Sequence, residues 1–176
     1  MPVQQLKEFL DGKDVRYISV QHSPAYTAQE IAKSAHICGD KLAKTVIIDI
    51  DGHMSMVVLP ASYRIRWDKF MKAMGTDFIE LADEEEFQGV FPGCEVGAMP
   101  PFGHLFGMHV YMCDVLSKYD EIAFSSGQHG EVIKMSYKDY VELAHPVVMT
   151  EGFTRPESKK KKTPSWITNK RMPQSA

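Results

Sequence analysis

The chain has 176 residues, of which 44% are hydrophobic and 24% are charged. This length and composition predict one globular domain with its own core and exclude a multidomain protein. No apolar run approaches the roughly 20 residues that a membrane-spanning helix needs, and the first residues lack the charged-then-apolar pattern of a signal peptide. We therefore expect a soluble, cytoplasmic protein.

The net charge of −3 is unevenly distributed along the chain. Residues 153–176 hold seven basic residues against the single acidic Glu157, a local charge of +6, which leaves −9 on residues 1–152. A dedicated duplex-DNA binder carries its basic stripe on the folded domain, so an acidic body argues against DNA as a partner. We predict a folded domain over 1–152 and a basic, flexible tail over 153–176 that is free to contact phosphate.

The first half of the chain predicts two helices around one strand. Apolar spacing indicates a helix over 3–10, and a strand follows near 15–20. Thr27-Ala28-Gln29-Glu30 has the form of a capping box, which predicts a helix that begins there and runs to about residue 36.

The middle of the chain predicts a β-hairpin. Two apolar, β-rich runs over 44–50 and 53–59 flank Asp51-Gly52, the dipeptide typical of a type I′ turn. Helical spacing then starts at Trp67 and ends at Gly75, and a short acidic helix is expected over 83–87.

Beyond a glycine- and proline-rich stretch from about residue 90, strands outnumber helices. We predict strands over 109–113, 121–124 and 132–135, a turn over 128–130 and a final helix over 137–144. The expected fold class is α/β of the α+β type, a mixed, mostly antiparallel, barrel-like sheet flanked by helices.

Two features suggest a site for an anion. The stretch 93–103 combines glycines, which let backbone N–H groups approach a ligand, with stiffening prolines, so it suits an oxyanion or phosphate cradle. Lys44 stands where the first hairpin strand begins, a place from which a side chain can point into a concave site. The alternatives are a purely structural turn and a solvated lysine at a strand end.

Histidines and cysteines give further candidates. His129 lies between Gly127 and Gly130 and is either a ligand contact or a turn residue. The three cysteines are dispersed without a CxxC pair, which indicates a reducing compartment and no disulfide framework. Cys94 and His104 form a cysteine–histidine pair that a cysteine hydrolase could use, and the alternative is an inert buried thiol.

Several common catalytic patterns are absent from the sequence. It contains no Walker P-loop, GxSxG elbow, HExxH motif or Rossmann glycine fingerprint, which removes support for nucleotide hydrolysis, serine hydrolysis and zinc proteolysis. His104 and His109 lack an identifiable third ligand, so no metal site is predicted.

Five ordered segments, 25–32, 41–48, 58–75, 97–103 and 126–129, resemble the YbaK/ProX family of aminoacyl-tRNA deacylases, which includes the editing domain of bacterial prolyl-tRNA synthetases. The resemblance spans roughly residues 15–145. It implies a trans-acting hydrolase that cleaves the ester of a mischarged tRNA carrying a small amino acid, with alanine or serine favoured over cysteine. It implies tRNA and a synthetase as partners, with no cofactor, metal, membrane or DNA.

The resemblance also implies roles for particular residues. Lys44 matches the family's lysine, and 97–101 matches its GxxxP loop, so Lys44 and Gly97 become the candidate catalytic residues. Lys44 would hold the terminal adenosine phosphate or the ester oxygens, and N–H groups near Gly97 would stabilise the oxyanion. Two other functions stay open: a non-catalytic regulator that binds charged tRNA or a synthetase, and a cysteine hydrolase using Cys94. The implied substrate-binding residues are Tyr26, Thr45, Met99, Pro100, Pro101, Gly127 and His129.

Overall fold

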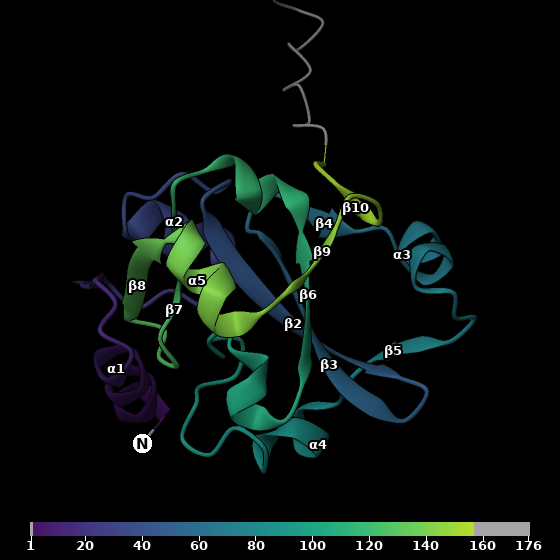
Figure 1. The fold of residues 1–176 in the computed structure, drawn as a ribbon, viewed down its shortest axis with the longest axis horizontal. Helices are drawn as coiled ribbons and strands as arrows, with labels where there is room; N and C mark the ends of the chain where they lie inside the picture. The colour runs from purple at the N-terminus through teal and green to yellow at the C-terminus, as the bar shows by residue number, and fades with distance from the viewer. Residues whose placement is uncertain (1, 157–176) are drawn as a thin grey trace, which may run out of the picture.

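The computed structural model describes residues 2–156 and shows one sheet with helices packed around it (Figure 1). The predicted flexible tail falls, from residue 157 onward, outside the described residues. No helix within 2–156 is long and apolar enough to cross a membrane. The helices are α1 (Pro2–Gly12), α2 (Ala28–Ser34), α3 (Trp67–Met74), α4 (Glu84–Gln88) and α5 (Tyr137–Ala144), with 3-10 turns η1 (Gly103–Phe106) and η2 (Asp114–Lys118).

The main sheet is mixed, as expected. Its strands follow the order β1-β8-β7-β2-β3-β6-β9, with β5 paired to β2, and β10 pairs with β4 in a separate two-stranded ribbon. Antiparallel pairs outnumber parallel ones, and the parallel pairs are β2 with β7, β3 with β6, and β6 with β9. The strands are β1 (Tyr17–Gln21), β2 (Leu42–Ile50), β3 (His53–Pro60), β4 (Arg64–Ile65), β5 (Ile79–Leu81), β6 (His109–Cys113), β7 (Glu121–Ser125), β8 (Glu131–Ser136), β9 (Val147–Met149) and β10 (Phe153–Thr154).

Local sequence signals account for the long central hairpin and its neighbouring helix. Asp51 and Gly52 both have positive φ, 52° and 85°, as a type I′ turn requires. The Thr27 side chain accepts a hydrogen bond from the Glu30 N–H, and the Glu30 carboxylate accepts one from the Thr27 N–H, which completes the predicted capping box of α2.

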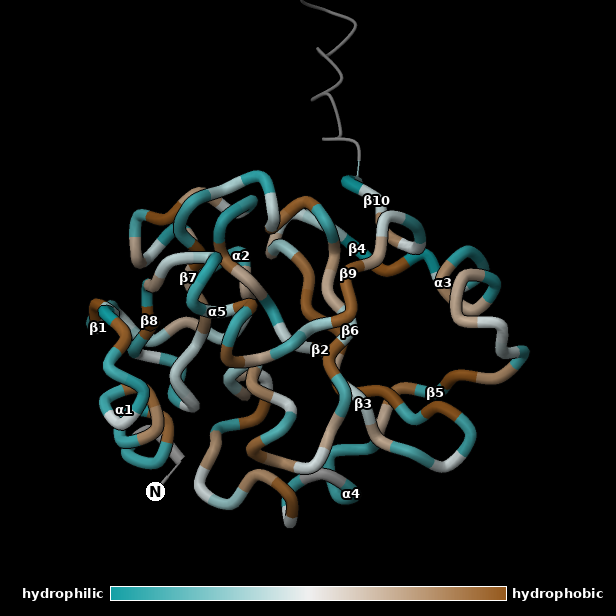
Figure 2. The backbone as a smooth tube through the Cα atoms, viewed as in Figure 1, coloured by the Kyte–Doolittle hydropathy of each residue, from teal (hydrophilic) through white to brown (hydrophobic). Residues whose placement is uncertain are grey.

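Side chains alternate across β2 and so divide the core between two faces. Ala43 and Ile47 face the larger core, where α1, α5 and the glycine- and proline-rich segment pack. Leu42 faces the other way onto α2, and Ile48 does so onto α3. Figure 2 shows hydrophobic stretches along these central strands. Because β2 is buried on both faces, a polar residue on this strand stands out.

The shortest elements were not predicted. The strands β4, β5, β9 and β10 have two or three residues each, too few to show an alternating pattern. Residues 153 and 154, which the sequence places at the start of the tail, pair with β4 as β10. The folded part therefore extends at least two residues beyond the expected boundary at 152.

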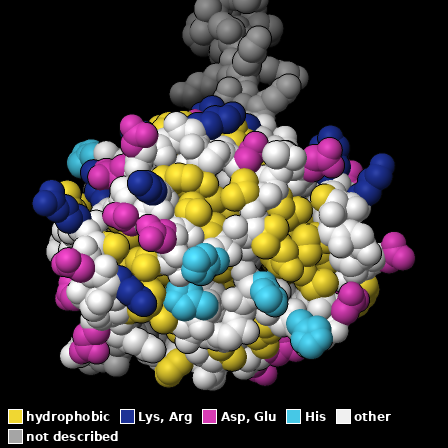
Figure 3. All heavy atoms as spheres, viewed as in Figure 1, with side chains coloured by type: hydrophobic (Ala, Val, Ile, Leu, Met, Phe, Trp, Pro, Cys, Tyr) yellow, Lys and Arg dark blue, Asp and Glu magenta, His cyan; other side chains and the backbone are white. Residues whose placement is uncertain are grey.

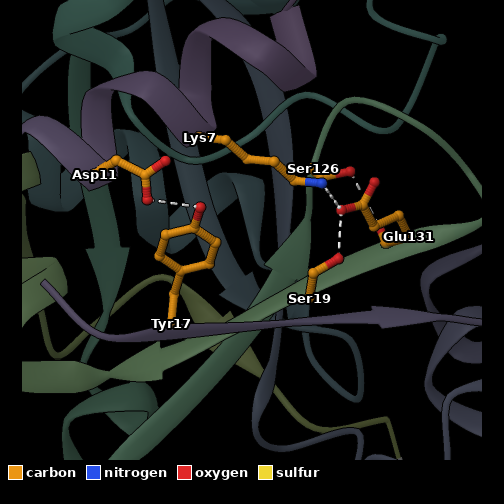
Figure 4. Close-up of polar contacts among 6 residues, drawn as sticks. All are labelled: Lys7, Asp11, Tyr17, Ser19, Ser126 and Glu131. Atoms are coloured by element: carbon orange, nitrogen blue, oxygen red, sulfur yellow. Dashed lines mark hydrogen bonds and ion pairs between the residues drawn. The ribbon is translucent and has the colours of Figure 1, made fainter.

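A partly buried ion pair joins α1 to the sheet. The Lys7 ammonium lies 2.6 Å from the Glu131 carboxylate, and the Ser19 hydroxyl donates to the same oxygen at 2.5 Å (Figure 4). Beside it, the Tyr17 hydroxyl donates to Asp11 at 2.9 Å, which joins β1 to α1. Glu131 begins β8, directly after the loop that carries His129, so this cluster anchors the base of that loop.

Candidate active site

A small cleft opens where β2 leaves β7. The two strands are parallel but pair only at Leu42 with Ala123 and Ala43 with Phe124. The next residue along each strand, Lys44 on β2 and Ser125 on β7, lines the cleft. Ligands commonly bind where neighbouring parallel strands end or diverge, because side chains there face a gap in the sheet. The cleft is lined by Ala28, Ile31, Leu42, Ala43, Lys44, Thr45, Gly97, Met99 and Ser125.

Lys44 is a half-buried cation without an anionic partner. No carboxylate within residues 2–156 forms an ion pair with its ammonium. Burial lowers the pKa of Lys44, and the neighbouring positive charge of Arg64 lowers it further. Both effects disfavour the charged form, and a bound anion would offset them. The arrangement is therefore suited to bind a negatively charged or developing negatively charged group.

The loop that contains Gly97 and Met99 lines the same cleft. The Ala98 N–H donates to the Glu95 carbonyl at 3.0 Å, which closes a turn whose third residue is Gly97. Gly97 has φ of 82°, a conformation typical of a type II turn that favours glycine. Within the described residues, the N–H groups of Gly97 and Met99 donate to no other group. They are therefore free to stabilise an oxyanion.

The β7–β8 loop is joined to this turn by Glu95. The Glu95 N–H donates to the Gly127 carbonyl at 2.9 Å, and the Glu95 carboxylate accepts from the His129 N–H at 2.6 Å. Although Glu95 is 34 residues away from His129, it fixes both loops to each other. The His129 ring then lies beside Gly97, with its Cε1 atom 3.7 Å from where a Cβ on Gly97 would stand.

Tyr26 completes this side of the site. Its ring centroid lies 5.2 Å from that of His129, and its side chain is 74% exposed. The Nδ1 atom of His129 is shielded from water and has no hydrogen-bond partner among the described residues. The histidine ring is thus held by packing and by its backbone hydrogen bond.

The two prolines expected to bind substrate lie behind the cleft. Pro100 and Pro101 are buried, and neither is among the lining residues. The hydroxyl of the fully buried Tyr140 donates to the Pro101 carbonyl at 2.9 Å. The structure therefore brings Lys44, Thr45, Gly97 and Met99 together in the cleft, sets His129, Gly127 and Tyr26 beside it, and uses the prolines to fix the loop to α5.

Sequence reasoning missed several members of the site. Ala28, Ile31, Leu42, Ala43 and Ser125 line the cleft, and Glu95 joins its two loops. For the four apolar residues, the sequence indicated only that they belong to a helix or a strand. Ser125 adjoins a recognised motif, so its position directly before Ser126-Gly127 was the one available clue. Nothing local indicates that Glu95 reaches His129.

The Cys94 thiol is poorly suited to act as a nucleophile. Burial raises its pKa to about 11, so it is protonated at neutral pH. The His104 ring packs instead against Phe9 and Phe102, with centroid separations of 5.2 and 6.2 Å. These contacts leave the predicted Cys94–His104 pair without support.

Histidines gather on one face of the molecule, among apolar patches (Figure 3). In the part of the chain that the structure describes, no three histidine, cysteine, aspartate or glutamate side chains are placed to hold a metal ion. A wider, open hollow lies next to α1 and β1, and four carboxylates outnumber the two cations, Arg16 and Lys134, in its lining, which disfavours a polyanionic ligand. Those carboxylates belong to Asp11, Asp14, Glu121 and Asp139.

The chain is similar in sequence or in fold to several known proteins. Proline–tRNA ligases from Staphylococcus saprophyticus and Staphylococcus aureus are 33% and 35% identical over 76 and 75 residues, which is 43% of this chain and 13% of the ligases. The fold is similar to that of a proposed trans-editing enzyme for prolyl-tRNA synthetase, with a TM-score of 0.73, 18% identity, and coverage of 86% of this chain and 96% of that one. The hypothetical protein APE2540 has a TM-score of 0.70 at 20% identity, covering 82% and 96%.

The family match includes the Gly97 turn, the β7–β8 loop and strand β2, which carries Lys44. The sequence model of the aminoacyl-tRNA editing domain matches residues 22–143, which contain Tyr26, Lys44, Gly97 and His129. The matched range runs from the segment before α2 to the end of α5, and so covers the whole cleft. On this match, the chain belongs to the aminoacyl-tRNA editing domain family.

Proposed function

We propose that the protein is a trans-acting deacylase that hydrolyses the ester of a tRNA mischarged with a small amino acid. The observation that carries this proposal is the unpaired Lys44 ammonium in one cleft with the free N–H groups of Gly97 and Met99. The structural neighbour proposed to be a trans-editing enzyme is covered over 96% of its length, which supports action as a separate protein.

The reaction needs no nucleophile from the protein. A water molecule attacks the ester carbonyl carbon, and the carbonyl oxygen becomes an oxyanion. The N–H groups of Gly97 and Met99 donate to that oxygen, which stabilises the transition state more than the ground state. The bond to the ribose oxygen then breaks, and the attacking group's proton ends on that oxygen. Lys44 holds the terminal adenosine phosphate or the ester oxygens as a compact positive charge.

The size of the cleft favours a small amino acid. The side chains of Ala28, Ile31 and Met99 narrow it, and Ile31 and Met99 are almost fully buried and cannot easily move aside. A synthetase pocket discriminates poorly against an amino acid smaller than its own substrate, so a second site that admits only small ones adds discrimination. We infer that alanine and serine are preferred over cysteine, with His129 positioned near the amino acid.

The test uses the tRNA for proline, charged in separate samples with alanine, serine, cysteine or proline, and measures the rate at which each amino acid is released. We expect rapid release of alanine and serine, slower release of cysteine and no release of proline. Each rate is compared with that of the Lys44→Met variant, which should be at least tenfold slower on every substrate released.

The same assay separates the other two functions. A regulator would bind charged tRNA or a synthetase without releasing any amino acid. A cysteine hydrolase would lose its activity on Cys94→Ala, and the buried, protonated thiol argues against that result.

A further inference from the structure

Arg64 stands at the same end of β2 as Lys44. The strand β3 ends at Pro60 opposite Ala43, and the Ala61 N–H donates to the Leu42 carbonyl at 2.8 Å. A tight turn follows, closed by a hydrogen bond from the Tyr63 N–H to the Pro60 carbonyl. This turn places Arg64, the first residue of β4, beside the mouth of the cleft.

The β4–β10 ribbon fixes the backbone at Arg64. Arg64 pairs with Thr154 and Ile65 pairs with Phe153. The Arg66 N–H, one residue beyond the ribbon, donates to the Gly152 carbonyl at 2.7 Å. The backbone position of Arg64 is therefore set by a short, hydrogen-bonded element and not by a free loop.

Arg64 differs from two other arginines near the ribbon in having no carboxylate partner. Arg66 pairs with Asp68 at 3.2 Å, and Arg155 pairs with Asp40 at 3.4 Å. Arg64 is exposed and makes no ion pair with any residue from 2 to 156. Its charge is close enough to Lys44 to disfavour protonation of that lysine. Two neighbouring cations without carboxylate partners repel each other, and an anion bound near both would offset that repulsion.

Asp40, which lies two residues before β2, already has several partners. The Asp40 carboxylate accepts hydrogen bonds from the Ser62 hydroxyl and, at 3.3 Å, from the Tyr119 hydroxyl, in addition to its ion pair with Arg155. Because Asp40 is engaged by these three groups, it offers little compensation to Arg64. Arg64 and Lys44 are thus both left without a carboxylate partner among the described residues, on a domain whose overall charge is negative.

We propose that Arg64 binds a backbone phosphate of the tRNA acceptor end, next to the nucleotide whose ester enters the cleft. This inference rests on the proposed function, because it takes the 3′ end of a tRNA as the ligand. A guanidinium binds phosphate through two parallel hydrogen bonds, so Arg64 would set the path of the strand into the cleft. Arg64 is a substrate-positioning residue in this scheme and takes no part in ester hydrolysis.

The experiment compares two substrates with the same ester, alanyl-tRNA and alanyl-adenosine, which lacks phosphate. For Arg64→Ala we expect kcat/KM to fall about tenfold on alanyl-tRNA, mainly through KM, and to stay within about twofold of wild type on alanyl-adenosine. Arg64→Lys retains the charge but loses the two parallel hydrogen bonds, so it should recover only part of the loss. Arg16→Ala, which removes an exposed arginine at the start of β1 on the opposite edge of the sheet, is the matched control and should behave as wild type.

Binding of uncharged tRNA tests the same contact without catalysis. The Kd for Arg64→Ala should rise about tenfold at low salt, and the slope of log K against log salt should become shallower by about 0.7 to 1, as expected for one lost phosphate contact. Thermal unfolding of each variant confirms that the ribbon is intact.

Three results would overturn the inference. They are an unchanged Kd and salt slope in Arg64→Ala, an equal loss on both substrates, and a wild-type protein that binds no tRNA. If wild type releases no amino acid but Arg64→Ala still weakens tRNA binding, the proposed deacylase function fails while the assignment of Arg64 stands.

Discussion

Lys7 and Lys44 are two partly buried lysines in contrasting surroundings. Lys7 lies 2.6 Å from Glu131, whose carboxylate also accepts from Ser19, so its charge is balanced inside the protein. Lys44 has no carboxylate among the described residues and has Arg64 beside it. The first arrangement joins α1 to β8, and the second is left incomplete until an anion binds.

This contrast shows how a buried charged residue can be assigned a structural or a functional role. A paired charge has its desolvation cost offset within the fold, and removing one partner destabilises the protein. An unpaired charge carries a cost that the fold does not offset, so removing it should not reduce stability. The predictions below test this division in order of decreasing effect.

The largest expected effect is on stability at Glu131. Glu131→Ala leaves the Lys7 ammonium partly buried without its partner, and we expect the free energy of unfolding to fall by about 3 kcal/mol. Denaturant unfolding measures this change. The double variant Lys7→Met with Glu131→Ala should recover part of the loss, because it leaves no uncompensated charge. A stability equal to that of wild type in Glu131→Ala would show that the pair is not structural.

The next effect is on catalysis at Lys44. Lys44→Met keeps an unbranched side chain but removes the charge, and kcat/KM should fall at least tenfold, about 1.4 kcal/mol of transition-state stabilisation. The melting temperature should be unchanged or higher, since a desolvated cation is lost. Lys7→Met is the matched control and should show the opposite pattern, lower stability with near-normal kcat/KM. If Lys44→Met and Lys7→Met changed stability equally, the distinction between a structural and a functional lysine would not hold.

Acid should weaken the Lys7–Glu131 pair. Burial tends to raise the pKa of Glu131, but hydrogen bonds from Lys7 and Ser19 outweigh it and hold the pKa below its usual value of 4.5. A carboxylate with a lowered pKa stabilises the fold above pH 4.5, and this stabilisation is lost as the pH falls through the folded-state pKa. Unfolding measured from pH 6 down to pH 3 should therefore decline more steeply for wild type than for Glu131→Gln. Parallel curves would contradict this prediction.

The smallest effect is expected at Cys94, which is half-buried beside the Gly97 turn. Like Lys44 it has no charged partner, but its raised pKa keeps it neutral, so no anion or cation is needed to complete its surroundings. Cys94→Ala should change kcat/KM by less than about twofold. Deacylation assays with this variant test whether the contrast between Lys44 and Cys94 depends on charge. A large loss of activity would mean that a buried residue without a partner can be catalytic even when it is neutral.

Several features of the protein are determined by local sequence alone. The Asp51-Gly52 hairpin, the capping box of α2, α3 ending at Gly75 and α5 over 137–144 all form as their sequences predict. In each case, interactions among residues close in sequence are sufficient to form the element, such as positive φ at a turn or a side chain that caps the adjacent backbone. Lys44 and Gly97 became candidate site residues through the resemblance of their segments to the YbaK/ProX family.

Only the tertiary structure decided which of these residues share a site. Pro100 and Pro101 belong to the same motif as Gly97 and Met99, yet they face Tyr140 and the core. Ser125 and Glu95 enter the site through strand divergence and a hydrogen bond between residues 34 positions apart. The charge balance of Lys7 and Lys44 also depends on which carboxylate the fold brings within a few ångströms. Coulomb and hydrogen-bond energies depend on distance in space, and the spacing of residues in a sequence does not determine that distance.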